Sequence, residues 1–253
     1  MPDEIRKRIL ELDGRAIPYR LLRRPGRRSV AIELEPRLGL SVLAPARLPL
    51  REIDAILSRE QAWLRRKLQD WAHWERSHPP RRFVDGESLL LLGESWLLTV
   101  REAGDGRRAS VRREERRNGP GRIELRLPGP LPEAARRALA ESALASWYRR
   151  LARRILAARV AYWSAILGLT AGPISIRDNR SRWGSCSASG RLSFNWKIVM
   201  AAPAVIDYLV VHEICHLAHP DHSPEFWGRV EGALPDYRPP RNWLRRHGES
   251  LYL

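Results

Sequence analysis

The stretch VIDYLVVHEICHLAHPDHSPEFW, residues 205–227, carries the strongest pattern in this chain. It holds four of the seven histidines within eleven residues. His212 and His216 are four residues apart, so on a helix both imidazoles lie on one face, one turn apart. This spacing suits two ligands of one zinc ion, and Glu213 lies where a carboxylate reaches a metal-bound water. The stretch therefore predicts a metal-binding helix.

A catalytic zinc site has three protein ligands and one open position, so a third ligand is needed. His222 follows a turn, because Pro220 interrupts the helix and lets the chain fold back toward the metal. His219 would face the metal only if the helix continued, and Glu225 would be carried by the next helix. The sequence favours His222 and leaves the other two as alternatives.

Three neutral histidines would leave Zn²⁺ its full charge and lower the pKa of a bound water toward ~7. Glu213 is then predicted to act as general base, taking the proton of that water as its oxygen attacks a peptide carbonyl. It would afterwards pass the proton to the leaving amine. The candidates for holding the oxyanion are Tyr237, Arg180 and Arg182, and those for supporting the ligand histidines are Asp207 and Asp236.

The segment before this helix is predicted to be a β-hairpin. Residues 182–196 form two β-compatible arms around a turn at 187–190, after a short strand at 174–178. An exposed strand edge beside a metal can pair with the backbone of an extended polypeptide. Cys215, inside the histidine motif, is expected to be a buried small side chain.

The earlier part of the chain reads mainly as strands. Period-two alternation and turn residues predict strands at 15–22, 29–35, 40–43 and 122–127, and two strands with a turn at 92–94 within 85–100. Helical spacing of apolar residues predicts one helix at 50–74 and a long one from Pro132 to Leu167. Short helices are expected at 224–231 and 239–247, and no sequence repeat is evident.

These elements predict an α+β fold. The Pro/Gly cluster at 128–130 is the expected boundary between a β-rich N-terminal subdomain, residues 1–130, and a second domain, residues 131–253, that carries the histidine motif. In the second domain a long backing helix and a small sheet with the hairpin would support the helix that carries H-E-x-x-H.

Charge is distributed unevenly along this basic protein. The net charge is +16, and residues 171–253 hold 10 Lys/Arg against 8 Asp/Glu, whereas residues 1–170 hold 35 against 21. A positive field of this kind favours nucleic acid, nucleotide or acidic protein partners. The arginines of the long helix that could line a phosphate-binding face are 136, 137, 149, 150, 153, 154 and 159.

Composition also predicts the compartment. Two cysteines are too few for a disulfide framework. The first ten residues carry charges where a signal peptide needs an apolar core, and no apolar run approaches the ~18–20 residues of a membrane span. The chain is expected to be cytoplasmic, with no membrane partner.

Three motifs together resemble one family. NRSRWGSCS (179–187), LSFNW (192–196) and VVHEICHLAHPDHSPEFW (210–227) are similar to the YgjP-like metallopeptidases, which are zincin-type proteins. The resemblance implies that residues 131–253 form a zincin-like metallopeptidase domain, a zinc hydrolase with His212, His216 and His222 as ligands and Glu213 as the catalytic carboxylate. The spacing from 212 to 222 is also similar to that of metzincins, although His219 stands where their turn carries glycine. A fainter resemblance extends to SprT-type proteases that act on DNA-bound protein.

The leading hypothesis is a zinc-dependent metallopeptidase that hydrolyses a polypeptide substrate with a Glu-activated, zinc-bound water. A second hypothesis is a metal-dependent nucleoside triphosphate (UTP) pyrophosphatase, because the resemblance extends to proteins linked to that activity and guanidinium groups bind phosphates well. A third is a nucleic-acid-associated protease that acts on DNA- or RNA-bound proteins and docks through the arginine-rich N-terminal part of the chain.

Overall fold

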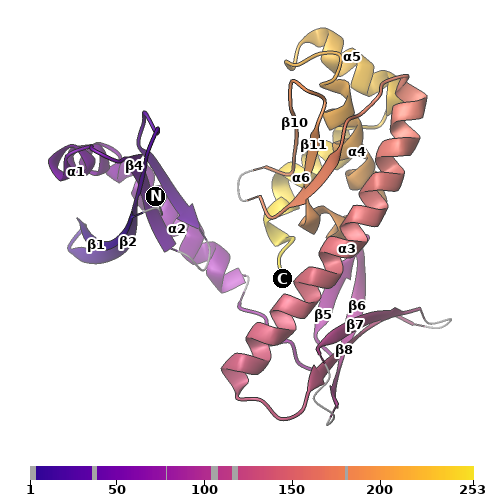
Figure 1. Cartoon of the computed structure of the whole chain (residues 1–253), viewed down its shortest axis with the longest axis horizontal. Helices are drawn as coiled ribbons and strands as arrows, with labels where there is room; N and C mark the ends of the chain where they lie inside the picture. The colour runs from indigo at the N-terminus through magenta and orange to yellow at the C-terminus, as the bar shows by residue number, and fades with distance from the viewer. Residues whose placement is uncertain (1–3, 36–38, 78, 104–107, 116–118, 180–181) are drawn as a thin grey trace. The chain divides into compact units, whose positions relative to one another are not determined.

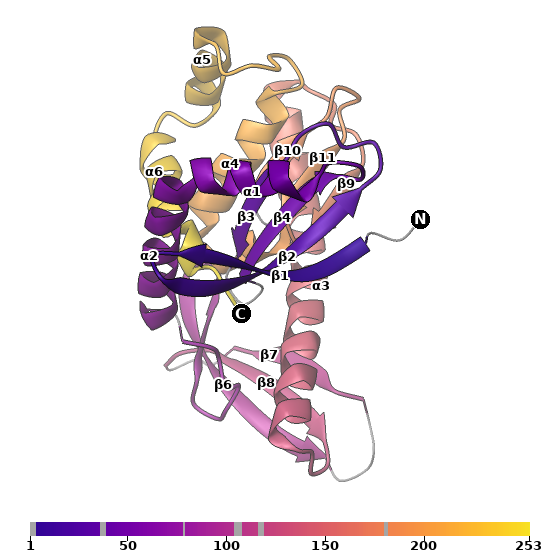
Figure 2. The same cartoon turned by 90° about the vertical axis from the view of Figure 1, so that its left-hand side faces the viewer.

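The computed structural model describes residues 4–35, 39–77, 79–103, 108–115, 119–179 and 182–253. The chain folds into two compact units, Met1–Pro80 and Arg81–Leu253 (Figures 1 and 2). The units therefore divide at residue 80 and not at the predicted boundary of 130. The reason is that the sheet formed by residues 88–128 shares its core with the helices of the metal-binding part.

The first unit is a four-stranded sheet with two helices. Its elements are β1 (Glu4–Leu12), β2 (Arg15–Arg24), β3 (Ala31–Glu35), β4 (Gly39–Pro45), α1 (Leu50–Arg59) and α2 (Gln61–Ser77). The strand order is β1-β2-β4-β3, and β2 and β4 are parallel. Apolar residues of β2 and β4, such as Leu21 and Val42, pack with Ile53, Leu57 and Leu64 of the helices to form a core of its own.

Two features of this unit differ from the sequence predictions. Strand β1 was not predicted, because Arg6, Lys7 and Arg8 follow one another and leave no period-two pattern, and pairing with β2 orders it. The single helix expected at 50–74 is two helices, because Glu60 has φ −89° and ψ 10°, which ends α1.

The second unit begins with another four-stranded sheet. Its strands are β5 (Ser88–Leu91), β6 (Glu94–Ala103), β7 (Ser110–Glu114) and β8 (Arg122–Pro128), in the order β5-β6-β8-β7. Helix α3 (Glu133–Leu167) follows and has 35 residues, so it is about 52 Å long. One part of α3 covers this sheet, and the rest continues alongside the metal-binding part (Figure 1).

The two four-stranded sheets have the same topology. In each, an antiparallel hairpin is followed by two more antiparallel strands, the second and fourth strands are parallel, and a helix comes next. In each sheet the turn of the first hairpin consists of two residues with positive φ, Asp13–Gly14 in one and Leu92–Gly93 in the other. Both fourth strands end in the pattern Pro-x-x-Leu-Pro, at 45–49 and 128–132, and the final proline caps the helix. The chain thus contains a structural repeat that the sequence did not reveal.

The hairpin turn of the second sheet joins that sheet to the metal-binding part. The backbone N–H groups of Leu92 and Gly93 donate to the carbonyl oxygens of Val199 and Met200, at 2.8 and 3.0 Å. Gly93 has φ +82°, and a Cβ atom there would lie 2.8 Å from Cα of Ala202. Only glycine fits both the backbone conformation and the space at this position.

The remaining elements surround the histidine motif. They are β9 (Ile174–Arg177), β10 (Gly184–Cys186), β11 (Leu192–Asn195), the 3₁₀ helix η1 (Trp196–Met200), α4 (Pro203–Cys215), α5 (Pro224–Ala233), α6 (Arg238–His247) and the 3₁₀ helix η2 (Gly248–Ser250). The predicted hairpin is confirmed as β10 and β11, with β9 parallel to β11. Among the described helices, none combines the length and apolar character that a membrane crossing requires.

Helix α4 is held against α3 by one polar cluster. The carboxylate of Asp207 accepts hydrogen bonds from Arg159 Nη2 at 2.8 Å and from Trp163 Nε1 at 3.1 Å. Apolar residues of α4, including Leu209 and Ile214, are buried in the common core. The helix that carries the histidine motif is therefore fixed on the long helix α3.

Candidate metal centre

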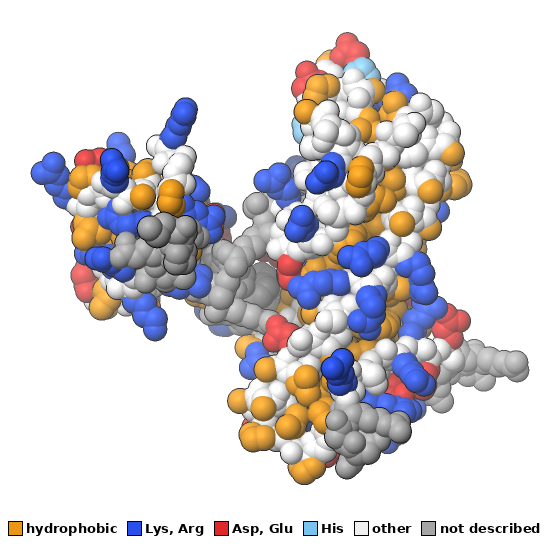
Figure 3. All heavy atoms as spheres, viewed as in Figure 1, with side chains coloured by type: hydrophobic (Ala, Val, Ile, Leu, Met, Phe, Trp, Pro, Cys, Tyr) orange, Lys and Arg blue, Asp and Glu red, His pale blue; other side chains and the backbone are white. Residues whose placement is uncertain are grey.

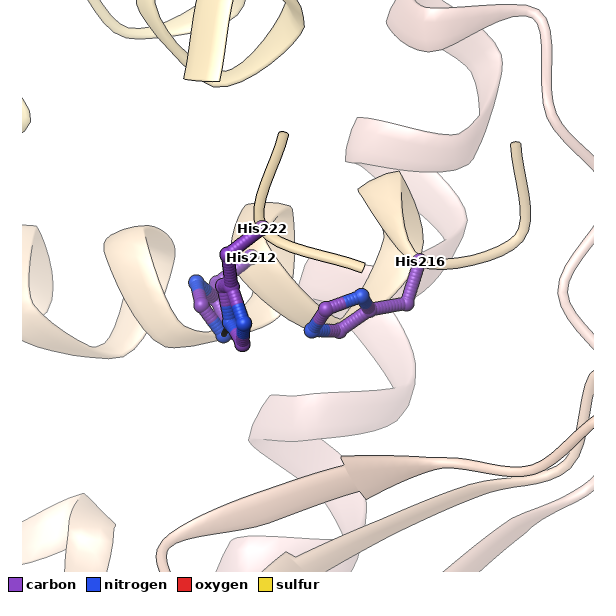
Figure 4. Close-up of side chains that lie close together, drawn as sticks. All are labelled: His212, His216 and His222. Atoms are coloured by element: carbon purple, nitrogen blue, oxygen red, sulfur yellow. Dashed lines mark hydrogen bonds between the residues drawn. The ribbon is translucent and has the colours of Figure 1, made fainter. Parts of the chain in front are cut away.

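The three predicted ligands converge on one point. His212 lies in the last turn of α4, His216 is the residue that ends this helix, and His222 lies in the loop before α5. One ring nitrogen from each residue lies within 4.8 Å of the others, and Figure 4 shows the rings pointing toward one another. Nε2 of His212 and Nε2 of His222 are 3.2 Å apart. Two ligand nitrogens of a tetrahedral zinc are about 3.3 Å apart, so this pair already has the spacing that a metal requires.

The third ligand reaches this point because the helix ends early. Helix α4 stops at Cys215, and the N–H groups of Leu217 and Ala218 donate to carbonyl oxygens three residues earlier, those of Ile214 and Cys215, at 3.0 and 3.1 Å. The chain therefore leaves the helix one turn before Pro220, earlier than the sequence indicated. His222 returns toward His212 and His216 across this turn.

The turn also orients one ligand ring. Nδ1 of His216 donates a hydrogen bond to the carbonyl oxygen of His219 at 3.0 Å. Because a carbonyl accepts only, Nδ1 carries the proton and Nε2 keeps its lone pair for a metal. His219 thus supports the site through its backbone, and its side chain is not among the ligand group.

Glu213 is buried against the edge of the small sheet. Only 4% of this residue is exposed. A Cβ atom on Gly184 of β10 would lie 2.4 Å from Oε1 of Glu213, so the carboxylate is packed directly against the strand backbone. A glycine inside a strand arm often marks the close approach of another group, but the pattern does not show which group that is. The contact places the predicted catalytic carboxylate beside β10.

Burial sets the protonation of the site. It raises the pKa of Glu213 to about 7, although the positive charge of Arg182 opposes the shift. Burial and the neighbouring histidines lower the pKa of His212 to about 3, and burial also lowers the pKa of His222. Both shifts favour the neutral imidazole of His212 and His222, which has a free lone pair for a metal ion.

An aromatic wall with a positive charge borders the histidines. Trp227 stacks on His222 with ring centroids 5.7 Å apart, and on Tyr237 at 5.5 Å. The guanidinium carbon of Arg241 lies 4.1 Å from the Trp227 ring centroid. Arg241 is also close enough to add to the lowering of the pKa of His212. The sequence did not indicate Arg241 as a site residue.

Several other candidates from the sequence lie outside the ligand group. Glu225 is exposed in the first turn of α5, and Asp236 is exposed. Asp207 binds Arg159 and Trp163 of α3, and none of its hydrogen bonds within the described residues goes to a histidine. Tyr237 is buried in the aromatic wall, and Arg182 is exposed near Glu213. Arg180 lies outside the described residues.

Comparisons with known proteins assign the class. The family model described as "YgjP-like, metallopeptidase domain" matches residues 28–247. Among solved structures, the crystal structure of the metallopeptidase zymogen of Pyrococcus abyssi abylysin is similar, with 21% identity and a TM-score of 0.34. The match covers 37% of this chain and 93% of that one. No curated protein matches the chain.

The fold is mixed α/β, three histidines lie close together in it, and the family match assigns the chain to the metallopeptidases. The chain belongs to the YgjP-like metallopeptidase family, as its three motifs predicted. Membership of this family implies a bound metal ion, commonly zinc.

Proposed function

We propose that this protein is a zinc-dependent metallopeptidase in which His212, His216 and His222 hold the metal. The observation that carries the proposal is the convergence of three histidine nitrogens within 4.8 Å. Three neutral imidazoles with one open position are the donor set of many catalytic zinc sites. When bound, zinc supplies a positive charge that acidifies water and polarises a substrate carbonyl.

Glu213 is the proposed general base and acid. Its side chain follows His212 directly on α4 and is held against β10, so it can meet a water beside the ligand group. In peptide hydrolysis its carboxylate takes one proton from the attacking water. It then gives this proton to the amine nitrogen of the product as the C–N bond breaks.

Strand β10 is the proposed docking edge for a polypeptide substrate. The sheet order is β10-β11-β9, and no strand in the described part of the chain pairs with the other side of β10. An extended peptide can add to such an edge through backbone hydrogen bonds. Because Gly184 touches Glu213, a peptide bound there would lie beside the proposed base.

The substitution Glu213→Gln tests this function. It removes the proton-accepting oxygen and keeps the size of the side chain, so we expect hydrolysis of a denatured protein to fall below about 1% while the bound metal is retained. Glu225→Gln, the same change at an exposed position, should leave both unchanged. Full hydrolysis by the Glu213→Gln protein would disprove the role of this residue.

The nucleotide hydrolase alternative receives less support from the described residues. Arg149 and Arg159 of α3 bind Asp178 and Asp207, at 2.9 and 2.8 Å, so these two guanidinium groups are engaged in holding the fold. Pyrophosphate release from UTP, measured with the same two variants, distinguishes this alternative from peptide hydrolysis.

A further inference from the structure

We propose that the second unit binds the phosphodiester backbone of nucleic acid in a hollow between β7 and α3. The hollow has a volume of about 490 Å³ and is separate from the histidine group, because none of its lining residues belongs to that group. Two guanidinium groups and three hydroxyl groups line it: Arg108, Arg150, Ser110, Ser142 and Ser146. Arginine and serine side chains are the donors that proteins commonly use for phosphate oxygens.

The two walls present these donors to the same space. Ser142, Ser146 and Arg150 are four residues apart on α3, so they lie on one face of the helix. Ser110 begins β7 on the opposite wall, and Arg108 lies two residues before this strand. All five side chains belong to exposed residues, so the donors are open to a ligand from solvent.

No acidic residue in the described part of the chain lines the hollow, so nothing described there neutralises its positive charge. Within the described residues, Arg108 and Arg150 form no ion pair, whereas their neighbour Arg149 pairs with Asp178 at 2.9 Å. Arg149 therefore has a structural partner, and the two arginines of the hollow remain available to bind an anion.

The charge pattern favours a polymer over a single phosphate. Arg153 and Arg154 follow Arg150 by three and four residues on α3 and are exposed. Figure 3 shows Lys and Arg side chains gathered over the middle of this helix. Positive charge therefore continues beyond the hollow, and from Ser142 to Arg154 the donors extend about 18 Å along α3, which is more than a single phosphate group covers. The net charge of +16 supports the same partner.

The test measures binding of the full chain to labelled single-stranded DNA and RNA of about 20 nucleotides by fluorescence anisotropy. The double variant Arg108→Gln/Arg150→Gln removes both guanidinium groups of the hollow. At about 0.1 M salt we expect it to bind about tenfold to thirtyfold more weakly than the natural chain. The slope of log K against log salt concentration should fall by about 1.4, the value for two lost contacts to a single strand.

The matched control is Arg245→Gln/Arg246→Gln, which removes the same charge from exposed positions of α6 that do not line the hollow. Its affinity and salt slope should stay close to those of the natural chain. Equal weakening by both double variants would show an effect of net charge alone and overturn the proposal. The proposal would also be overturned if the natural chain bound neither oligonucleotide. It would be overturned as well if inorganic phosphate displaced the oligonucleotide at the same total concentration of phosphate groups. Binding is measured without hydrolysis, so the outcome is independent of the proposed peptidase function.

Discussion

Gly184 and Glu213 are in such close contact that a Cβ atom on the glycine would lie 2.4 Å from Oε1 of the glutamate. Glu213 is only 4% exposed, so its carboxylate has little room to move away from the strand. The position of the proposed base is therefore set by the absence of a side chain on β10.

Gly184→Ala is expected to displace the carboxylate by a fraction of an ångström to an ångström. A displacement of this size at a reacting group can lower activity about 100-fold. Peptide hydrolysis should fall while the metal content stays the same, because the ligand histidines are not touched. Gly228→Ala, at a helical position with open space around it, is the control and should retain full activity. Full activity of the Gly184→Ala protein would contradict the close contact.

Removal of the His222 side chain tests the ligand set. His222→Ala should weaken metal binding at least about 100-fold, more than the loss of a residue that only supports a ligand. His219→Ala is the control, because its contribution to the site is a backbone carbonyl that alanine also provides. Its metal affinity, measured by competition with a chelator, should change less than about threefold. If His219→Ala and His222→Ala lost metal equally, the result would show that the His219 side chain is a ligand.

Arg241 is expected to stabilise negative charge on the substrate. Its guanidinium lies on Trp227, which stacks on His222, so a cation borders the site on this side. Loss of a group that stabilises an oxyanion costs about 100-fold in kcat. Arg241→Gln should therefore lower kcat without changing the metal content, and Arg241→Lys should restore part of it. Arg246→Gln, on the same helix, is the control. An unchanged kcat in the Arg241→Gln protein would assign this residue to packing alone.

Gly93→Ala tests the attachment of the second sheet to the metal-binding part. Its positive φ and the contact with Ala202 should together destabilise the fold by about 3 kcal/mol, or about 10 °C in Tm. Gly86 has nearly the same φ, +80°, but no atom lies within 4 Å of the place that a Cβ would take there. Gly86→Ala should therefore cost only about 1 kcal/mol, the cost of the backbone conformation. Equal losses of Tm in the two variants would show that the contact with Ala202 contributes nothing.

Local patterns were sufficient to predict most helices and strands. Alternation identified β2, β3, β4 and β8, and helical spacing identified α3 nearly to its ends. The close approach of His212, His216 and His222 was also predictable, because they lie within eleven residues and Pro220 excludes a continuous helix. Signals of this kind depend on neighbours in the sequence, which a single chain displays directly.

Features that depend on distant contacts were not predictable. The contact between Gly184 and Glu213, the position of Arg241 over Trp227 and the docking of Gly93 on Ala202 join segments that no short pattern connects. The predicted domain boundary at residue 130 differs from the observed one at residue 80 for the same reason. The Pro/Gly cluster at 128–130 marks the end of a strand and the start of a helix, and tertiary packing decides that both belong to one unit.

The hydrogen bonds from Leu92 and Gly93 to Val199 and Met200 decide how this protein can be shortened. A fragment that begins at residue 131 would lack the donors for these two carbonyl groups and would expose the face of α3 that the sheet covers. The smallest piece expected to fold with the metal ligands in place therefore begins at Arg81. The first unit has a core of its own and can be expressed or exchanged as a separate module.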